Sequence, residues 1–432
     1  PHARFSRVQT VAFTLLLLIA GSEFLYRGPV RGFRAVAFND FSTSYVASRL
    51  WLQGSDPYDA SLFLQALVAA GGKESAAHGS ATSMRPAYPP SMLPIMTLVA
   101  ALPFGSAAAA FETISLALFA GMLWAVMRIY GFAWVSAPGL VLIAYALALA
   151  PWHTALAVLS PSGIAIELAV IGIALSRAES GGVVTGFSLC LKPQVAVCFL
   201  VFQLATKQWK RAWWSLATVA LSTAVALARM PHGWVNSYHA NLHYFQASGG
   251  VNDFTTANPI RFDLVNLQVP FYFLFHDDRL ANLAAAMVAG TLALLWWRKR
   301  GDLAGIVLIG LLPFYQRIYN AGLVVLAIAW GFAHIHERRG KAALFASAVF
   351  LIPGGALLQT IHAKGWISDA AWRDNILLNV FLGPQATWAI LVIVFLVVSA
   401  AKSREGSAVE TRHNAAVAAV NSVNPTLAQT TR

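Results

Sequence analysis

Charged side chains are scarce in this sequence. They account for 11% of its 432 residues, while 58% are hydrophobic, whereas about a quarter of the residues in soluble proteins are charged. This shortage excludes an ordinary soluble domain. Apolar runs of about 20 residues recur along the chain, and they predict an all-α integral membrane protein with many spanning helices.

Cysteine is scarcer still, because only Cys190 and Cys198 occur. Both lie in one apolar stretch, and on a single helix their Cα atoms would be about 12 Å apart. A disulfide requires less than about 7 Å. We therefore expect two buried packing residues and no disulfide framework.

Acids are the rarer of the two charge types, with 18 Asp and Glu against 30 Lys and Arg, which leaves a net charge of +12. The excess cations cluster between apolar runs, so membrane topology explains them and no nucleic-acid partner is expected. Arg4 and Arg7 predict a cytoplasmic amino terminus. The later clusters predict the same side for residues 207–211, 298–300, 338–341 and 402–404. Four segments should then face outward: residues 38–88, 230–278, 315–320 and 362–385.

The expected membrane domain covers residues 1–402, and residues 403–432 should form a disordered cytoplasmic tail. Two of its apolar runs are unusual. Residues 90–103 are short for a full crossing, and residues 182–205 are interrupted by Lys192-Pro193, as in a broken helix that lines a cavity. The other expected spans are 8–24, 106–128, 134–151, 156–176, 209–229, 303–314, 322–335, 341–361 and 386–401.

The longest polar segment between apolar runs is residues 38–88. It contains four of the 18 acidic residues of the chain: Asp40, Asp56, Asp59 and Glu74. It should begin with a helix along the membrane surface, with Asp40 near its start and Phe38, Phe41, Tyr45 and Leu52 on its apolar face. Residues 54–57 carry turn chemistry. Asp59 can cap a second short helix that ends near Ala70.

The order of these features resembles glycosyltransferase family 87, a group of polytopic GT-C enzymes related to the mannosyltransferase of mycobacterial phosphatidylinositol mannoside synthesis. The matching residues are Asp40-Phe41, Tyr45 to Leu50, Gly54-Ser55-Asp56-Pro57-Tyr58, Tyr88-Pro89-Pro90 and Lys192-Pro193. The resemblance implies a GT-C-type helical bundle of about 10–13 membrane segments in a bacterial inner membrane. The active site would face the periplasm.

It further implies transfer of a hexosyl (for example mannosyl) or pentosyl residue from a polyprenyl-phosphate sugar to a glycolipid or glycan acceptor. The reaction would invert the anomeric centre and need neither metal nor other cofactor. One departure concerns the acceptor: relatives carry a His in the region of residues 315–320, where this chain has Gln316-Arg317-Ile318-Tyr319.

Asp40 is the candidate general base. An acid just beyond the end of a membrane-spanning helix can contact both a lipid-linked donor and a polar acceptor. The alternative is that Asp40 only caps its helix. Lys192 and Arg317 are the candidate donor-phosphate ligands, since an ionisable group in an apolar run is a functional candidate and an Arg fork suits a phosphate. Alternatively, Lys192 only extends its charge to the membrane interface (snorkelling), and Arg317 only anchors its segment at that interface. Tyr88, His239, Tyr319 and Gln316 are candidates for orienting substrate.

Three other interpretations of the sequence are a metal site, a transporter and a scaffold. His239 and His243 have the i, i+4 spacing of a helical metal pair, but two ligands do not make a site and no His-Glu-x-x-His pattern is present, so no metal is expected. The broken segment at Lys192 would also suit a membrane transporter or lipid flippase. A scaffold without chemistry would leave Asp40 dispensable.

Overall fold

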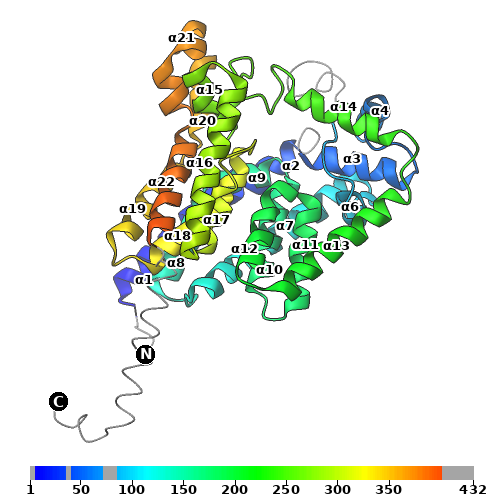
Figure 1. Cartoon of the computed structure of the whole chain (residues 1–432). Coiled ribbons are helices and arrows are strands. Elements are labelled where there is room, and N and C mark those ends of the chain that lie inside the picture. Colours follow the sequence, from blue (N-terminus) through cyan, green and yellow to red (C-terminus); the bar gives the residue numbers. More distant parts are fainter. Residues whose placement is uncertain (1–4, 36–39, 72–84, 401–432) are drawn as a thin grey trace, which may run out of the picture.

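A computed structural model describes residues 5–35, 40–71 and 85–400, and this part of the chain is helical throughout, without strands (Figure 1). The first helices are α1 (Arg7–Leu25), η1 (Tyr26–Val30), α2 (Arg31–Ala35), α3 (Asp40–Leu52), α4 (Ala60–Ala69), α6 (Met92–Ala100) and α7 (Phe104–Tyr130). Then come α8 (Ala137–Ala148), α9 (Ala150–Ala157), α10 (Pro161–Ala174), α11 (Ala178–Leu191), α12 (Pro193–Ala205), α13 (Trp209–Leu227) and α14 (Trp234–Gln246).

The last third of the chain begins with the short η3 (Arg261–Asp263) and α15 (Gln268–Phe275), which precede the long α16 (Asp278–Lys299). The remaining elements are α17 (Leu303–Ile309), η4 (Ile318–Leu323), α18 (Val324–Ala333), α19 (Arg338–Ser347), η5 (Ala348–Leu351), α20 (Gly354–Ala363), α21 (Asp369–Asp374), η6 (Leu377–Leu382) and α22 (Gln385–Ala400). Local signals start several of them. Ser6 forms a capping box with Gln9 at α1, and Asp277 caps α16.

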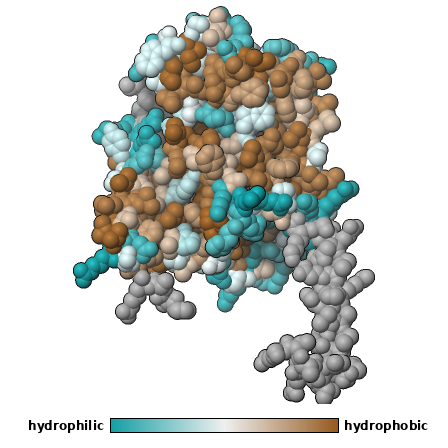
Figure 2. Space-filling view, turned by 90° about the vertical axis from the view of Figure 1, so that its left-hand side faces the viewer, coloured by the Kyte–Doolittle hydropathy of each residue, from teal (hydrophilic) through white to brown (hydrophobic). Residues whose placement is uncertain are grey.

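Four described segments are long and apolar enough to cross a membrane: Arg7–Arg34, Phe104–Tyr130, Asp278–Lys299 and Arg338–Ala363. The α8–α9 pair, bent by 50°, would make a fifth span, and five shorter apolar helices accompany these. Figure 2 shows apolar side chains spread over one broad face, and exposed Phe345 and Phe395 agree with a surface that meets lipid. The fold is therefore the all-α polytopic membrane fold that the composition predicts.

Helix α18 lies at the centre of the larger core. Each residue from Val324 to Trp330 is at most 3% exposed, because α7, α8, α17, α19 and α22 surround this helix. A second core joins α3, α4, α6 and α7, with Phe41 and Tyr45 at its middle. The functional cavity described below adjoins this second core.

The predicted first helix of this segment exists as α3, with Asp40 as the first residue described after residues 36–39. Its expected position along the membrane surface stays a prediction, but the helix is covered by protein. Residues Phe41 to Ser48 are all buried, on every side of the helix, because α4, α6 and α10 pack around α3. Phe38, Glu74 and residues 403–432 lie outside the described part of the chain. The Asp59 cap is confirmed, since its carboxylate accepts hydrogen bonds from the backbone of Ser61 and Leu62 at the start of α4.

Helices α11 and α13 approach each other closely through glycine. A Cβ atom on Gly182 would lie 2.4 Å from the carbonyl oxygen of Arg211 and 2.6 Å from Cβ of Trp214. Small residues allow such contacts between membrane helices. At Gly290 on α16, by contrast, an added Cβ would meet nothing within 4 Å.

We therefore expect Gly182→Ala to destabilise the folded protein by about 1–3 kcal/mol, the usual consequence of overpacking. The thermal midpoint in detergent should fall, and Gly290→Ala, the matched control, should leave it unchanged or raise it slightly. Equal midpoints for the two variants would contradict close α11–α13 packing.

Candidate active site

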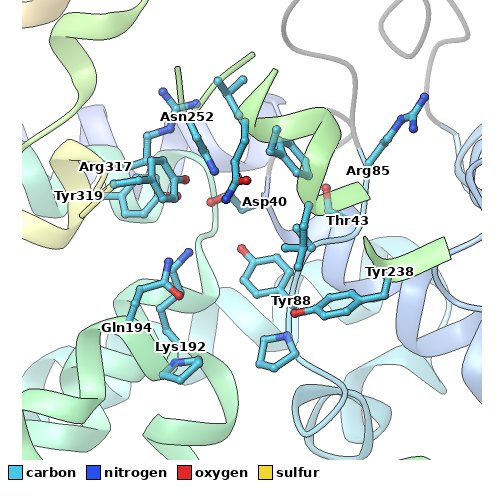
Figure 3. Close-up of a pocket in the computed structure, with 18 residues that line it drawn as sticks. Asp40, Thr43, Arg85, Tyr88, Lys192, Gln194, Tyr238, Asn252, Arg317 and Tyr319 are labelled. Carbon is cyan, nitrogen blue, oxygen red and sulfur yellow. The ribbon is translucent and has the colours of Figure 1, made fainter. Parts of the chain in front are cut away.

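A cavity of about 460 Å³ opens where the predicted outer segments meet. Its walls come from the first turn of α3, the non-helical segment at residues 85–89, the α11–α12 junction, α14 and residues 315–319 (Figure 3). Five predicted site residues line it: Asp40, Tyr88, Lys192, Arg317 and Tyr319. The structure thus brings together residues that are up to 279 positions apart in the sequence.

Asp40 stands in the first turn of α3 and faces the cavity. Its Oδ2 accepts a hydrogen bond of 2.9 Å from Oγ of Ser160, the N-cap residue of α10. Leu159, immediately before it, has φ +48°, an unfavourable left-handed conformation for a residue with a Cβ. Strained backbone of this kind is concentrated at functional sites. Here it directs the Ser160 side chain toward the carboxylate.

Lys192 occupies the break between α11 and α12, with extended backbone angles of φ −148° and ψ 79°. The predicted interruption of residues 182–205 is therefore confirmed. Its side chain is only 7% exposed, and the Nζ atom lies 5.3 Å from the centre of the Tyr88 ring, a cation–π distance. The first residues of α12, Pro193 and Gln194, also line the cavity. The positive end of that helix dipole thus adds to the lysine charge.

Arg317 is held by its backbone. It forms an antiparallel bridge with Leu264, and the neighbouring Gln316 carbonyl accepts a 2.7 Å hydrogen bond from the Val265 N–H group. This pairing directs the guanidinium into the cavity, where it interacts electrostatically with the carboxylates of Asp263 and Asp40. Gln316 itself is fully buried and donates to Gln194 O and accepts from Asn320, so it lies behind the cavity wall.

The tyrosines of the site are neutral hydrogen-bond donors. Burial, reinforced by the nearby Asp40 carboxylate, raises the pKa of Tyr88 well above its ordinary value, and its hydroxyl also interacts with Ser160. Burial likewise raises the pKa of Tyr315, against the influence of the Arg317 guanidinium. Burial raises the pKa of Asp263 while Arg317 opposes that effect, so the Asp263 carboxyl group is close enough to balance part of the arginine charge.

Helix α14 forms the wall opposite the two cations, and the sequence reasoning did not single it out. Tyr238, Leu242, Phe245 and Gln246 contribute from this helix, Thr43 and Arg85 lie on the same side, and Asn252 lies nearer to Arg317. Two bonds of 2.9 and 3.0 Å from Asn241 to the carbonyls of Tyr58 and Pro86 attach α14 to the first outer segment. The aromatic i, i+4 spacing of Trp234 and Tyr238 was the available signal.

The remaining candidates lie elsewhere. His239 is exposed on α14 and is not among the residues that line the cavity. Asp253 accepts hydrogen bonds from Gly249 and Thr255 and so shapes its own loop. Asp56 closes the Asp-Pro-Tyr turn by accepting from the Tyr58 N–H group. Among the described residues, no three His, Cys, Asp or Glu side chains are grouped as a metal site would need.

Three cations and one carboxylate line the cavity. Lys192, Arg317 and the amino terminus of α12 lie on one side of Asp40, and Arg85 lies on the other side, near Tyr238. Cations of this kind bind a phosphate, and a carboxylate between the two walls can accept a proton. Fold and site together are those of an integral membrane protein with a polar, charged cavity.

The family comparison agrees with this class. The model of glycosyltransferase family 87 matches residues 87–360, more than half of the 432-residue sequence. The chain belongs to glycosyltransferase family 87, and it is accordingly a membrane glycosyltransferase rather than a transporter. Comparisons with curated proteins and with solved structures gave no match. The matched range includes Tyr88, Lys192 and Arg317, and begins after Asp40.

We expect the cavity to bind a lipid phosphate through Arg317. With decyl phosphate as the probe, Arg317→Gln should raise the dissociation constant at least tenfold, because a hydrogen bond to a charged group contributes about 1.5–3 kcal/mol. Arg317→Lys should bind between wild type and Gln, since the charge remains but the fork is lost.

Isothermal titration in detergent measures these constants. Arg49→Gln, which removes an exposed cation of α3 outside the cavity, is the matched control and should bind as wild type. Wild-type affinity in Arg317→Gln would remove Arg317 from the phosphate site and make Lys192 the first candidate.

Proposed function

We propose that this membrane glycosyltransferase transfers a hexosyl or pentosyl residue from a polyprenyl-phosphate sugar to a hydroxyl of a glycolipid or glycan, on the outer face of a bacterial inner membrane. The observation that carries the proposal is the single cavity in which Asp40 lies between the Lys192–Arg317 cations and the α14 wall. A nucleotide-sugar donor would not require a site among membrane helices, whereas a prenyl phosphate would.

In the proposed reaction the acceptor hydroxyl loses its proton to the Asp40 carboxylate, and the hydroxyl oxygen forms a bond with the anomeric carbon. The bond from that carbon to the phosphate oxygen breaks, and the prenyl phosphate leaves with the electron pair. One displacement at one carbon inverts its configuration. No metal or other cofactor takes part in the steps assigned to these residues.

The cations act on the leaving group. Lys192 and Arg317 would neutralise the negative charge that develops on the departing phosphate oxygen, an electrostatic contribution that is often among the largest in catalysis. Tyr88 and Tyr319 are proposed to orient the donor through their neutral hydroxyls. The α14 side, with Tyr238 and Gln246, is left for the acceptor, since aromatic rings and amide groups suit a sugar.

A donor panel tests this function. Purified protein should release prenyl phosphate from at least one polyprenyl-phosphate hexose or pentose when a lipid extract supplies acceptors, and it should leave nucleotide sugars unchanged. Mass spectrometry follows both products. Turnover of a nucleotide sugar without prenyl phosphate release would contradict the proposed donor class.

A further inference from the structure

A second cleft lies at the far end of α12 from the catalytic cavity. Helix α12 begins beside Lys192 and has 13 residues, so its other end is about 20 Å away at 1.5 Å per residue. There a cleft of about 340 Å³ separates the carboxyl ends of α12 and α16. Its lining contains two cations and no acid: Ala205, Thr206, Lys207, Trp296, Trp297, Arg300 and Gly301.

Both cations occupy backbone positions that favour glycine. Lys207 has φ +60° and Arg300 has φ +52°, and they are two of only four non-glycine residues with positive φ in the described part of the chain. Helices commonly end on a left-handed residue, which is usually glycine because it has no Cβ. Helix dipoles favour cations near these ends. The helix dipole alone, however, explains only why cations lie near the helix ends. It does not explain why Lys207 and Arg300 themselves have a left-handed backbone, or why both line the same cleft.

The floor of the cleft is closely packed. Trp296 is 2% exposed, its Nε1 atom donates a 2.8 Å hydrogen bond to the Asp302 carbonyl, and its ring centre lies 6.4 Å from that of Phe202 on α12. A Cβ atom on Gly301 would lie 2.2 Å from Cδ1 of Trp296, so only glycine lets the backbone lie against the indole. The floor of the cleft is thus formed by a buried indole that packs between α12 and α16.

Tryptophans place this cleft at a membrane–water border. Trp297 in its lining is 44% exposed, and Trp209 and Trp213 on the adjoining α13 are 63% and 70% exposed. Exposed tryptophan beside Lys and Arg is typical of the headgroup level of a bilayer. A phosphate there would meet both cations, while the acyl chains continue along the apolar helices.

We propose that the Lys207–Arg300 cleft binds the phosphodiester headgroup of an anionic phospholipid, in the leaflet opposite the catalytic cavity. The headgroup phosphate lies between the two cations, and the indole rings cover the glycerol region. An annular lipid held at this point stabilises the α12–α16 contact, and α12 in turn carries Lys192 at its other end.

The test compares lipid retention by native mass spectrometry after delipidation, with equal amounts of phosphatidylglycerol and phosphatidylcholine. Wild type should retain one phosphatidylglycerol at least tenfold more strongly than phosphatidylcholine. Lys207→Gly with Arg300→Gly should lose that preference by about ten- to thirtyfold, as expected for two cations near a headgroup. Glycine fits both left-handed positions, so the thermal midpoint of the lipid-free double variant should not fall.

The matched control removes two cations of the same end that do not line the cleft, Lys210→Gln with Arg298→Gln, and should keep the preference. An equal loss in this control would show a general surface-charge effect and overturn the site. Displacement of the lipid by millimolar inorganic phosphate would show that the cleft selects the free anion, which overturns the lipid assignment.

Discussion

The hydrogen bond from Ser160 to Asp40 connects the two parts of the molecule that the site requires. Asp40 belongs to the first outer segment and Ser160 to the start of α10, inside the helical bundle. This hydrogen bond restrains the Asp40 carboxylate, in the first described turn of α3, in its position facing the cavity. The left-handed Leu159, buried in the second core, holds the serine in place, so local strain is offset by packing.

Interruptions of helices supply the other polar groups. Lys192 enters the cavity because α11 and α12 are separate helices there, and Arg317 enters because residues 312–317 pair with residues 264–267 instead of continuing α17. Irregular backbone at membrane depth is tolerated where it lines a cavity. The charged residues of the site are thus placed by breaks, and the long spans around them supply stability.

Local signals in the sequence predicted much of this arrangement. The helix that contains Asp40, the Asp59 cap and the break at Lys192-Pro193 depend on neighbouring residues, so they can be recognised from short motifs. The burial of α3 could not be recognised, because it depends on α6 and α10, which lie far along the chain. The Ser160 contact, the α14 wall and the inward side chain of Gln316 likewise follow from tertiary packing. The order of residues along the chain does not show which way these side chains point, because that depends on helices that are distant in the sequence.

The central claim is that Asp40 accepts the acceptor's proton, and the rate of transfer by Asp40→Asn tests it most directly. Asparagine keeps the size and most of the capping ability of aspartate but cannot act as the base. Transfer should fall by about 10²–10⁴, while decyl phosphate affinity and the thermal midpoint stay near wild type. Asp56→Asn, in the turn that Asp56 closes, is the matched control and should retain activity. Wild-type transfer by Asp40→Asn would contradict the account.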